Sequence, residues 1–420
     1  MKEVIFYRDH PKDPDNFMQM GQLYRYDRNT KSVVFGEYPK AWVWRKWDRR
    51  KFWNFFKKYR DAINFIPVGD RTATLRVVVA KYFEFNDLCS HPAADGIFNI
   101  TDGSPNRMIL AALGRSMATD LQAQLKPRDT EEQHAIREAT RGGITFAKKG
   151  YQGQGYKYDI VSCYPSVAAS PDCMFPIGDS EFVTVQEADP DVPALLKVQI
   201  GGEDSCPWFR RPFGEDGTGW MTNVDVQMAI DLGLDVQLVG SPNCLRFEGH
   251  VSGKELFGNY FDSLFVLKKE GVPGAKFLLN KTVGLFAIKR YCTYGKGGDR
   301  TMSKHPTDDQ YEVMSIVPDD SDGFVSKVID KMDLYSNPKY CIFNCFITAY
   351  ARQRLVDIFV RLDCADDVVH VHTDGWICSK PLSPLDLPLS RELGGIKLEY
   401  EGQVHVHHVN KVRDGEDNKI

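Results

Sequence analysis

The sequence predicts an α+β fold in which an antiparallel sheet carries paired acidic residues and helices pack beside it. Three observations predict this fold. An apolar, strand-like segment leads into Asp159, and two further apolar runs flank the turn at Thr373-Asp374-Gly375, as in a β-hairpin. Residues 275–286 instead repeat their apolar side chains with the period of a helix.

Length and charge limit the possible functions without choosing among them. A chain of 420 residues is too long for one compact core and should divide into two or three subdomains. Its 53 Lys and Arg against 57 Asp and Glu give a net charge of −4. Any affinity for nucleic acid must therefore come from local basic patches.

Cysteine usage and hydropathy favour an intracellular protein. The ten cysteines are scattered, with no Cys-x-x-Cys pair, which favours reduced thiols over a zinc site or a disulfide framework. No basic-then-apolar leader begins the chain, and no apolar run approaches the length that spans a membrane. We expect a soluble protein of the cytoplasm without a membrane partner.

A carboxylate at the end of a strand, with an aromatic neighbour, is suited to metal chemistry. After Asp159 the chain turns sharply through Ser162, Tyr164 and Pro165. Phosphoryl transfer by two divalent cations needs at least two acidic groups that converge from different strands. Asp374, near the apex of the predicted hairpin, is the best candidate for the partner, with an ordinary Asp-Gly surface turn as the alternative.

The predicted helix carries two polar residues that are suited to hold a triphosphate. Lys276 and Asn280 are four residues apart, so both project from one helical face. The alternative is an ordinary amphipathic helix with a solvated Lys. Residues 259–286 together predict two helices separated at Gly271–Gly274, and a long helix is predicted from Pro338 to Leu362.

Together and in this order, the three segments resemble motifs A, B and C of family B DNA polymerases, most closely the protein-primed branch. The family's motif A, Asp-x-x-Ser-Leu-Tyr-Pro-Ser, differs here only at Cys163. Its motif C, Asp-Thr-Asp-Ser, keeps Asp374, the expected metal ligand. His372 and Gly375 replace its first Asp and its Ser, so one negative charge beside the metals is lost.

Motif B of the family, Lys-x-x-x-Asn-Ser-x-Tyr-Gly, is matched in part. Its Lys, its Asn and its Gly, here Gly284, are present, whereas Lys281 and Val283 replace its Ser and its Tyr. The family's Tyr packs near the nascent base pair. The resemblance therefore implies either looser base selection or a shift of that role to Phe277 or Phe286.

Four further segments extend the resemblance over residues 139–413. Arg141-Gly142-Gly143 resembles the family's Tyr-x-Gly-Gly segment without its Tyr, and Phe346–Arg352 resembles the helix before motif C. Leu393–Glu399 resembles the strand Leu-Gly-x-Trp-Lys-x-Glu. Lys411 falls where the family has the Lys of Lys-x-Tyr, which contacts the primer end and nearby phosphates.

The resemblance implies a right-hand polymerase: an α+β palm with an antiparallel sheet, helical fingers and an extra N-terminal α/β domain. The implied activity is that of a DNA-directed DNA polymerase, which adds deoxynucleotides to a primer 3′-hydroxyl by two-metal phosphoryl transfer, in viral or mobile-element replication without proofreading. The implied parts are 1–138 (N-terminal domain), 139–175 (palm with motif A), 176–255 (insertion and palm), 256–286 (fingers with motif B), 287–340 (second insertion) and 341–420 (palm with motif C and C-terminal strands, thumb reduced or absent).

The resemblance also implies a role for each site residue. The catalytic residues are Asp159, Asp374 and Lys276, and the metal ligands are Asp159, the carbonyl of Ile160, and Asp374. The nucleotide-binding residues are Ile160, Ser162, Tyr164, Lys276, Asn280 and Gly284. The DNA-binding residues are Arg141, Gly142, Gly143, Thr373 and Lys411. The cofactors are two Mg²⁺ ions, which Mn²⁺ can replace. The partners are primer–template DNA, deoxynucleoside triphosphates and, as further candidates, a terminal protein or a processivity factor.

Two other classes of function stay open: a catalytically silent polymerase relative that binds DNA, and a primase or RNA-synthesising palm enzyme. Retention of Asp159, Tyr164, Lys276 and Asp374 together argues against the silent relative, because a scaffold has no use for that set. In the family the Tyr of motif A lies under the sugar and excludes a 2′-hydroxyl. Tyr164 therefore argues against ribonucleotide synthesis.

Residues 1–138 contain no acidic pair set in an apolar strand, so we expect no 3′–5′ exonuclease there. Asp129-Thr-Glu131 opens a predicted helix, where acidic residues cap the N-terminus. A strand-like run is predicted at Ala73–Phe83 and a helix at 106–124. The segment Trp44–Arg60 interleaves basic and aromatic residues, suited to stacking on bases, with an aromatic core stripe as the alternative.

The sequence ends at Ile420, seven residues after Arg413, where the family would continue into a thumb. A thumb grips the duplex behind the primer end. The resemblance therefore implies weak holding of DNA unless another segment or protein substitutes.

Overall fold

The computed structural model describes residues 3–7, 24–27, 32–35, 64–68, 88, 91–94, 96–98, 105–201, 207–212, 214, 217–272, 274–294, 311–319, 323–383 and 387–420. The chain forms two compact units, Met1–Ser116 with Asp262–Leu278 and Met117–Phe261 with Leu279–Ile420, and each is described by itself. The segments predicted at Trp44–Arg60 and Ala73–Phe83 lie outside the described residues.

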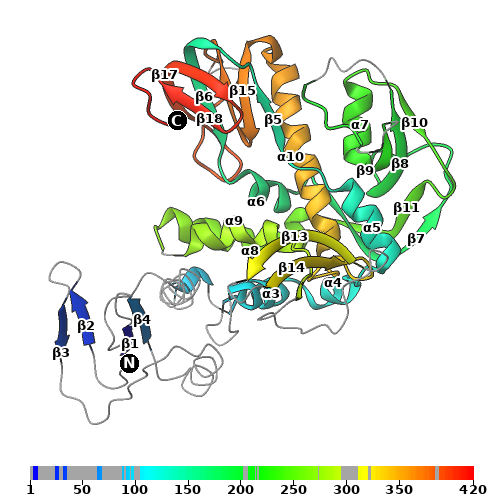
Figure 1. Ribbon diagram of the computed structural model, residues 1–420. Helices are drawn as coiled ribbons and strands as arrows, with labels where there is room; N and C mark the ends of the chain where they lie inside the picture. The colour runs from blue at the N-terminus through cyan, green and yellow to red at the C-terminus, as the bar shows by residue number, and fades with distance from the viewer. Residues whose placement is uncertain are drawn as a thin grey trace. The chain divides into compact units, whose positions relative to one another are not determined.

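In the first unit the described strands form two small pairs. β1 (Glu3–Tyr7) and β4 (Asn64–Val68) run parallel, whereas β2 (Tyr24–Asp27) and β3 (Ser32–Phe35) run antiparallel. Both pairs carry labels in Figure 1. The described strands of this unit thus include one parallel and one antiparallel pair.

The helix predicted at 106–124 is two helices. α3 (Pro105–Ser116) closes the first segment of the first unit, and α4 (Thr119–Gln124) lies in the second. Between them Ala118 has an extended backbone, with φ −62° and ψ 145°. The prediction of one continuous helix was wrong because no Gly or Pro marks this break in the sequence.

The helix predicted to begin after Asp129 is confirmed, together with its cap. α5 (Thr130–Ala139) starts with a capping box: Asp129 Oδ1 accepts a hydrogen bond from the Glu132 amide at 2.9 Å, and Glu132 Oε2 accepts one from the Asp129 amide at 2.7 Å. Each carboxylate therefore satisfies a backbone donor that the first turn leaves unpaired. Asp129 serves the helix end, as the sequence predicts.

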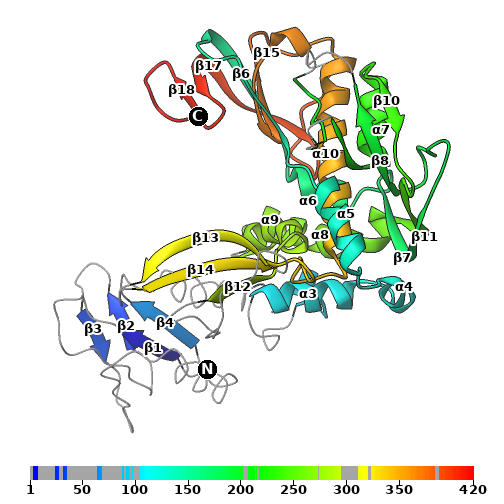
Figure 2. The same ribbon diagram turned by 45° about the vertical axis from the view of Figure 1, so that its right-hand side comes forward.

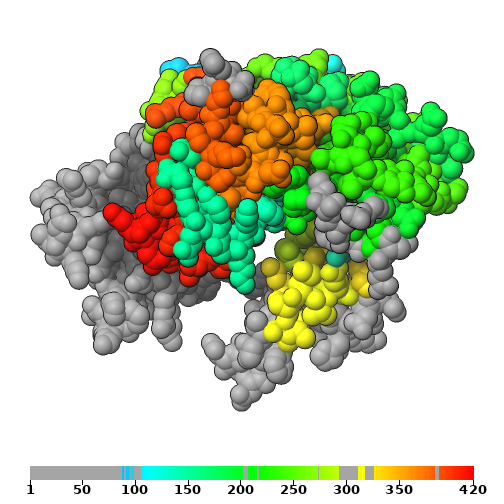
Figure 3. All heavy atoms as spheres, turned by 90° about the horizontal axis from the view of Figure 1, so that it is seen from above, coloured from blue at the N-terminus to red at the C-terminus, as the bar shows by residue number. Residues whose placement is uncertain are grey.

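The second unit contains a six-stranded antiparallel sheet. The strands in spatial order are β18 (Lys411–Asp414), β17 (Ile396–His408), β6 (Gln152–Ile160), β16 (Gly375–Cys378), β15 (Val368–Thr373) and β5 (Ile144–Ala147). Figure 3 shows the C-terminal strands (red), β5 and β6 (blue-green) and β15 with its neighbours (orange) side by side on the surface of this unit. Strands distant in sequence thus meet in one layer.

Gly155 allows β17 to lie close to β6. A Cβ atom at Gly155 would lie 2.6 Å from Cγ2 of Val404 and 3.0 Å from Cγ2 of Ile377. Both neighbours belong to a small apolar cluster on this face, whose other buried members are Val369, Val406 and Val412. The glycine is therefore required by the packing of the cluster.

The opposite face of the sheet packs against α10 (Cys341–Arg361), the long helix that the sequence predicts. The Trp376 ring stacks on Tyr158, with centroids 5.5 Å apart, and Phe359 of α10 meets it edge-on at 5.9 Å. Successive side chains of a strand point to opposite faces. Asp159, which follows Tyr158 on β6, therefore points away from α10.

Residues 174–252 form a second sheet beside α10. It has the order β10-β8-β11-β7, with β9 paired to β8. Its elements are β7 (Met174–Val183), β8 (Ala194–Ile200), β9 (Thr218–Thr222), α7 (Asn223–Asp231), β10 (Val236–Leu238) and β11 (Cys244–Ser252). Figures 1 and 2 show α10 between α7 and the six-stranded sheet. The long helix thus contacts both layers.

The predicted helix pair is α8 (Gly253–Lys269) and α9 (Ala275–Phe286). α8 begins earlier than predicted because Ser252 and Glu255 form a capping interaction. Ser252 Oγ accepts from the Glu255 amide at 3.2 Å and donates to Glu255 Oε2 at 2.5 Å. The Ser-x-x-Glu pattern was present in the sequence as a start signal.

The end of α9 packs into an aromatic cluster. Phe286 is fully buried, and its ring stacks on Tyr340 at 5.5 Å and on Phe257 at 5.6 Å. After α9 come β12 (Tyr291–Tyr294), β13 (Tyr311–Asp319) and β14 (Gly323–Asp330), which form a three-stranded antiparallel sheet.

The cysteines in the described residues carry free thiols, as predicted. In the same part of the chain, no helix is long and apolar enough to cross a bilayer.

Candidate active site

The segment after Asp159 is held in a sharp turn by residues 394 and 395. The Val161 amide donates to the Gly395 carbonyl at 2.8 Å, and the Gly394 amide donates to the Val161 carbonyl at 2.9 Å. Ser162 then adopts a left-handed conformation, with φ 51° and ψ 54°, and α6 (Cys163–Ala168) begins. The turn predicted after Asp159 is therefore present, and Gly394 and Gly395 hold it in place.

Asp374 lies at the tip of the predicted hairpin, between β15 and β16. Thr373 before it is left-handed, with φ 62°, and its hydroxyl donates to Asp374 Oδ1 at 2.7 Å. The Asp374 carbonyl accepts a hydrogen bond from the amide of Ile160 at 3.1 Å. The hairpin tip is thus bonded directly to the residue that follows Asp159.

The register of the strands brings the two carboxylates to one edge of the sheet. Asp159 is paired across the strands with Gly375 on one side and with Lys397 on the other. A Cβ atom at Gly375 would lie 3.4 Å from Asp159 Oδ1. The structure therefore confirms that the segments at Asp159 and Asp374 converge.

The environment of Asp159 disfavours its negative charge. Burial raises the pKa of Asp159 above its usual range, the nearby Asp374 carboxylate raises it further, and an ion pair with Lys397 opposes both. The Lys397 ammonium lies 3.1 Å from Asp159 Oδ2. The Lys397 ammonium does not fully offset the repulsion between the two carboxylates. A further cation bound at this site would therefore be stabilised.

The donor set fits Mg²⁺ that arrives with a phosphate ligand. Among the described residues, no three His, Cys, Asp or Glu side chains gather as a complete metal-binding set. Two carboxylates are nevertheless suitable, because Mg²⁺ in nucleotide-processing sites commonly binds one or two carboxylates together with water and substrate phosphates. The residues that would hold it are Asp159 and Asp374.

Tyr164, Gly143 and Thr373 meet beside the carboxylates. A Cβ atom at Gly143 would lie 2.9 Å from the hydroxyl oxygen of Tyr164 and 3.0 Å from Cα of Thr373. Burial, ahead of nearby negative charge, raises the pKa of Tyr164 to about 12, so its phenol is neutral at physiological pH. Three residues predicted for nucleotide or DNA binding thus form one contact.

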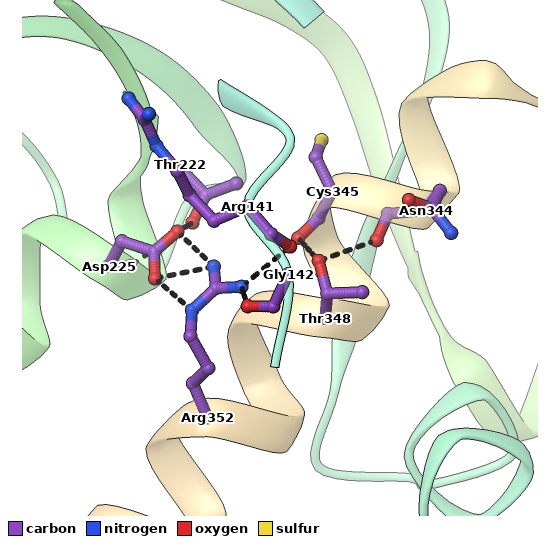
Figure 4. Close-up of polar contacts among 8 residues, drawn as sticks. All are labelled: Arg141, Gly142, Thr222, Asp225, Asn344, Cys345, Thr348 and Arg352. Atoms are coloured by element: carbon purple, nitrogen blue, oxygen red, sulfur yellow. Dashed lines mark hydrogen bonds and ion pairs between the residues drawn. The ribbon is translucent and has the colours of Figure 1, made fainter. Parts of the chain in front are cut away.

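Arg352 fixes the segment before β5, and its importance was not recognised in the sequence. Its Nη1 donates to the carbonyls of Arg141 and Gly142, both at 2.9 Å, and its Nε and Nη2 pair with the Asp225 carboxylate at 2.7–3.0 Å (Figure 4). Arg352 is fully buried. An Arg that directly follows the largely apolar stretch Cys345–Ala351 of a long helix is the signal that could have identified it.

The surroundings of the Arg141 side chain favour a structural role over DNA binding. Its side chain is 2% exposed, and burial lowers its pKa to about 10. Gly142, next to it, is exposed, and a Cβ atom at this position would meet nothing within 4 Å. The part of this segment that faces solvent is therefore Gly142 rather than the Arg141 guanidinium.

The exposed face of α9 carries the residues predicted to bind a nucleotide. Lys276, Asn280 and Gly284 are all exposed, and a Cβ atom at Gly284 would meet nothing within 4 Å. Val283 is buried, and its carbonyl accepts a hydrogen bond from Asn344 Nδ2 at 3.2 Å. Lys276 belongs to the first unit and Asn280 to the second, so the approach of α9 to the carboxylates stays a prediction.

The suggestion that Phe286 takes the role of the family's motif B Tyr is wrong, because Phe286 is fully buried in the aromatic cluster. Phe277, the other candidate, is half-buried. Of the two aromatic residues, Phe277 alone has exposed surface with which to contact a ligand.

Lys411 lies at the other end of the six-stranded sheet from Asp159. It pairs with His408 on β17, just beyond the pairing of His405 with Gln152. Gln152 and Asp159 lie near opposite ends of β6. At a rise of about 3.4 Å per residue, they are separated by roughly 24 Å. A Lys side chain cannot bridge that length.

Comparisons with known proteins give the family of the chain and its fold. Residues 115–341 match the family described as DNA polymerase type B, organellar and viral. No curated protein has a significantly similar sequence.

Solved structures of Phi29 DNA polymerase share the fold. The complex with primer–template DNA and incoming nucleotide substrates is 17% identical, with a TM-score of 0.52 over 73% of this chain and 55% of that chain. The complex with single-stranded DNA is 16% identical, with a TM-score of 0.55 over 77% and 57%. Identities this low establish the fold alone, and they confirm the predicted α+β right-hand fold. This chain spans slightly more than half the length of the Phi29 protein.

Proposed function

The chain belongs to the organellar and viral family of type B DNA polymerases, and from this premise we propose that it is a DNA-directed DNA polymerase, which adds deoxynucleotides to the 3′-hydroxyl of a primer. The observation that carries the proposal is the hydrogen bond from the Ile160 amide to the Asp374 carbonyl, which joins the two acidic segments at one sheet edge. Convergent carboxylates on neighbouring strands suit phosphoryl transfer.

Asp159 and Asp374 hold divalent cations in this proposal, with the Ile160 carbonyl as a further ligand. Two Mg²⁺ ions held there would supply activation of the primer hydroxyl and neutralisation of the triphosphate and of the leaving pyrophosphate. The raised pKa of Asp159 supports the assignment, because the site stabilises added positive charge. The chain's own contribution is to hold both carboxylates rigidly.

The nucleotide contacts come from the turn after Asp159 and from α9. Lys276 stabilises charge that develops on the phosphates, and Asn280 positions the nucleotide. The open space at Gly284 leaves room for the nucleotide. Tyr164, supported from the turn at Ser162, lies under the sugar and excludes a 2′-hydroxyl.

The DNA contacts extend along the six-stranded sheet. Gly142 and Gly143 lie against one strand of the DNA near Thr373. Hydrogen bonds to their backbone carbonyls hold the two glycines in place. Lys411 contacts duplex phosphates away from the primer end, since the strand register separates it from Asp159. The Arg141 side chain is buried and does not contact DNA in this proposal.

The wider assignments are part of the same proposal. The palm comprises residues 139–175 and 341–420, the fingers comprise 256–286, and 1–138 has no proofreading activity. The setting is viral or mobile-element replication, with a terminal protein or a processivity factor as candidate partners. The boundaries rest on motif positions.

Primer extension by the purified full chain tests the proposal. With Mg²⁺ or Mn²⁺ the protein should extend a primed template with deoxynucleotides, and Asp374→Asn should abolish extension while primer–template binding persists. Asp366→Asn is the matched control, because Asp366 is exposed and lies just before the same hairpin. A wild-type protein that binds primer–template but extends it with neither metal would support the silent DNA-binding relative instead.

The choice of sugar separates this proposal from an RNA-synthesising enzyme. Tyr164→Ala should gain ribonucleotide incorporation relative to the wild type. Equal use of ribonucleotides by both proteins would remove Tyr164 from sugar selection.

A further inference from the structure

Four charged side chains form an alternating row that begins at Asp159. Lys397 lies 3.1 Å from Asp159 and 2.6 Å from Glu399 Oε1, and Lys157 lies 2.9 Å from Glu399 Oε2. These side chains are between 21% and 36% exposed, so they are partly shielded from water but open on one side. The row therefore connects the candidate metal ligand to a second carboxylate through one shared ammonium.

A β-bulge builds this arrangement. Along β17, Leu398 pairs with Tyr158 and Tyr400 pairs with Lys157, so Glu399 is an extra residue without a partner across the strands. A bulge changes the direction of the side chain at the extra position. Here the carboxylate of Glu399 reaches the ammonium groups of both lysines.

Lys397 has two acceptors, and the shorter contact is to Glu399. It can leave Asp159 and keep an ionic partner, because Glu399 remains within reach. Ion pairs at this degree of exposure are weak, so a divalent ion is able to displace such a contact. Asp159 in turn lies near the Asp374 carboxylate, which after burial is the next cause that raises the pKa of Asp159.

We propose that Lys397 is a positioning residue whose ammonium neutralises Asp159 before a divalent ion binds, and that it withdraws to Glu399 when the ion arrives. The inference rests on the proposed metal-binding role of Asp159. Its consequence is that Lys397 weakens metal binding by the free protein. Tight binding then requires the phosphates that accompany the metal in a nucleotide complex.

Binding of Mn²⁺ alone tests the inference, without DNA, nucleotide or turnover. The signal of free Mn²⁺ in electron paramagnetic resonance gives the dissociation constant for the full-length protein. The difference between wild type and Asp159→Asn defines the contribution of this site. Lys397→Met removes the ammonium but keeps an unbranched side chain, and Lys397→Gln is the second variant if the first fails to fold, as judged by circular dichroism.

The expected result is that Lys397→Met tightens Mn²⁺ binding at the Asp159-dependent site by about two- to fivefold, the range for loss of a weak competing ion pair. Lys157→Met is the matched control: it removes a charge from the same row but no contact with Asp159, and should change the constant less. The inference is overturned if Lys397→Met leaves binding unchanged or weakens it, or if Lys157→Met has an equal effect.

The same titration distinguishes this inference from the function on which it rests. If Asp159→Asn binds Mn²⁺ like the wild type, Asp159 is no metal ligand, and the proposed two-metal site fails along with the inference. If Asp159→Asn loses the site while Lys397→Met gains nothing, the metal site stands and only the role of Lys397 is rejected.

Discussion

Gly143 and Tyr164 are in direct contact, because a side chain at Gly143 would place its Cβ atom 2.9 Å from the Tyr164 hydroxyl oxygen. The same atom would lie 3.0 Å from the backbone of Thr373 at the hairpin tip. Three separate segments of the chain therefore meet at one position, where no side chain fits.

Gly143→Ala should reduce the efficiency of primer extension by about 10- to 100-fold, since displacement of a positioning group by about 1 Å has effects of that size. The added methyl group must move either Tyr164 or the tip at Thr373. Steady-state kcat/KM for a deoxynucleotide measures the loss. Gly142→Ala is the matched control, because its Cβ would meet nothing within 4 Å. Equal losses in both variants would contradict the contact as the cause.

Gly155→Ala should lower the free energy of unfolding by about 1–3 kcal/mol, the usual cost of overpacking. The new methyl group would overlap Val404, whose Cγ2 lies 2.6 Å from its position. Chemical denaturation measures the change. Val404→Ala in the same chain should restore part of the lost stability, and a double variant less stable than both single variants would show that another contact is responsible.

Lys289→Met should stabilise the protein at neutral pH and lose this advantage in alkali. Burial lowers the pKa of Lys289 to about 8, and its ammonium lies 3.7 Å from the centroid of the Tyr335 ring. Because the unfolded-state pKa is about 10.4, the folded chain binds fewer protons than the unfolded chain between about pH 8 and 10.4. The free energy of unfolding therefore rises with pH through this window.

The expected gain from Lys289→Met at pH 7 is about 1–3 kcal/mol, reduced by loss of the cation–π contact. Unfolding midpoints of variant and wild type, compared at pH 7 and pH 10, measure it. Lys327→Met is the control, since Lys327 is exposed and its ammonium lies 3.8 Å from the Tyr291 ring centroid. A gain that stays constant with pH would rule out the buried ammonium as its source.

Asp225→Asn should destabilise the second unit by about 3–5 kcal/mol, because it leaves the buried guanidinium of Arg352 without its counter-charge. Thermal unfolding followed by circular dichroism measures the shift. Asp231→Asn, an exposed residue on the same helix, should have no measurable effect. An unchanged midpoint for Asp225→Asn would mean that the ion pair adds nothing to stability.

The sequence predicted those helices and strands whose signals lie within a few neighbouring residues. The hairpin at Asp374 follows from its Asp-Gly turn, the helix after Asp129 from its cap, and the helix at 275–286 from its period. The break at Ala118 has no such signal. The start of α8 at Ser252 has such a local signal, the Ser-x-x-Glu pattern, although the helix was predicted to begin later.

The surroundings of the candidate site could not be predicted, because they depend on contacts between distant residues. Arg352 and Asp225 are 127 residues apart. The bulge that turns Glu399 toward Lys397 depends on the register of β17 against β6, which periodicity alone does not give. The convergence of Asp159 and Asp374 could be predicted because two-metal phosphoryl transfer needs at least two acidic groups from different strands. The roles of both residues remain predictions.

The ion pair between Asp225 and Arg352 makes the sheet of residues 174–252 an unsuitable target for deletion. The guanidinium of Arg352 is fully buried, so a shortened chain would retain a cation in the protein interior with half of its hydrogen-bond acceptors removed. A minimal version of this protein would require replacement of Arg352 at the same time. The two segments can therefore be redesigned, exchanged or lost only together.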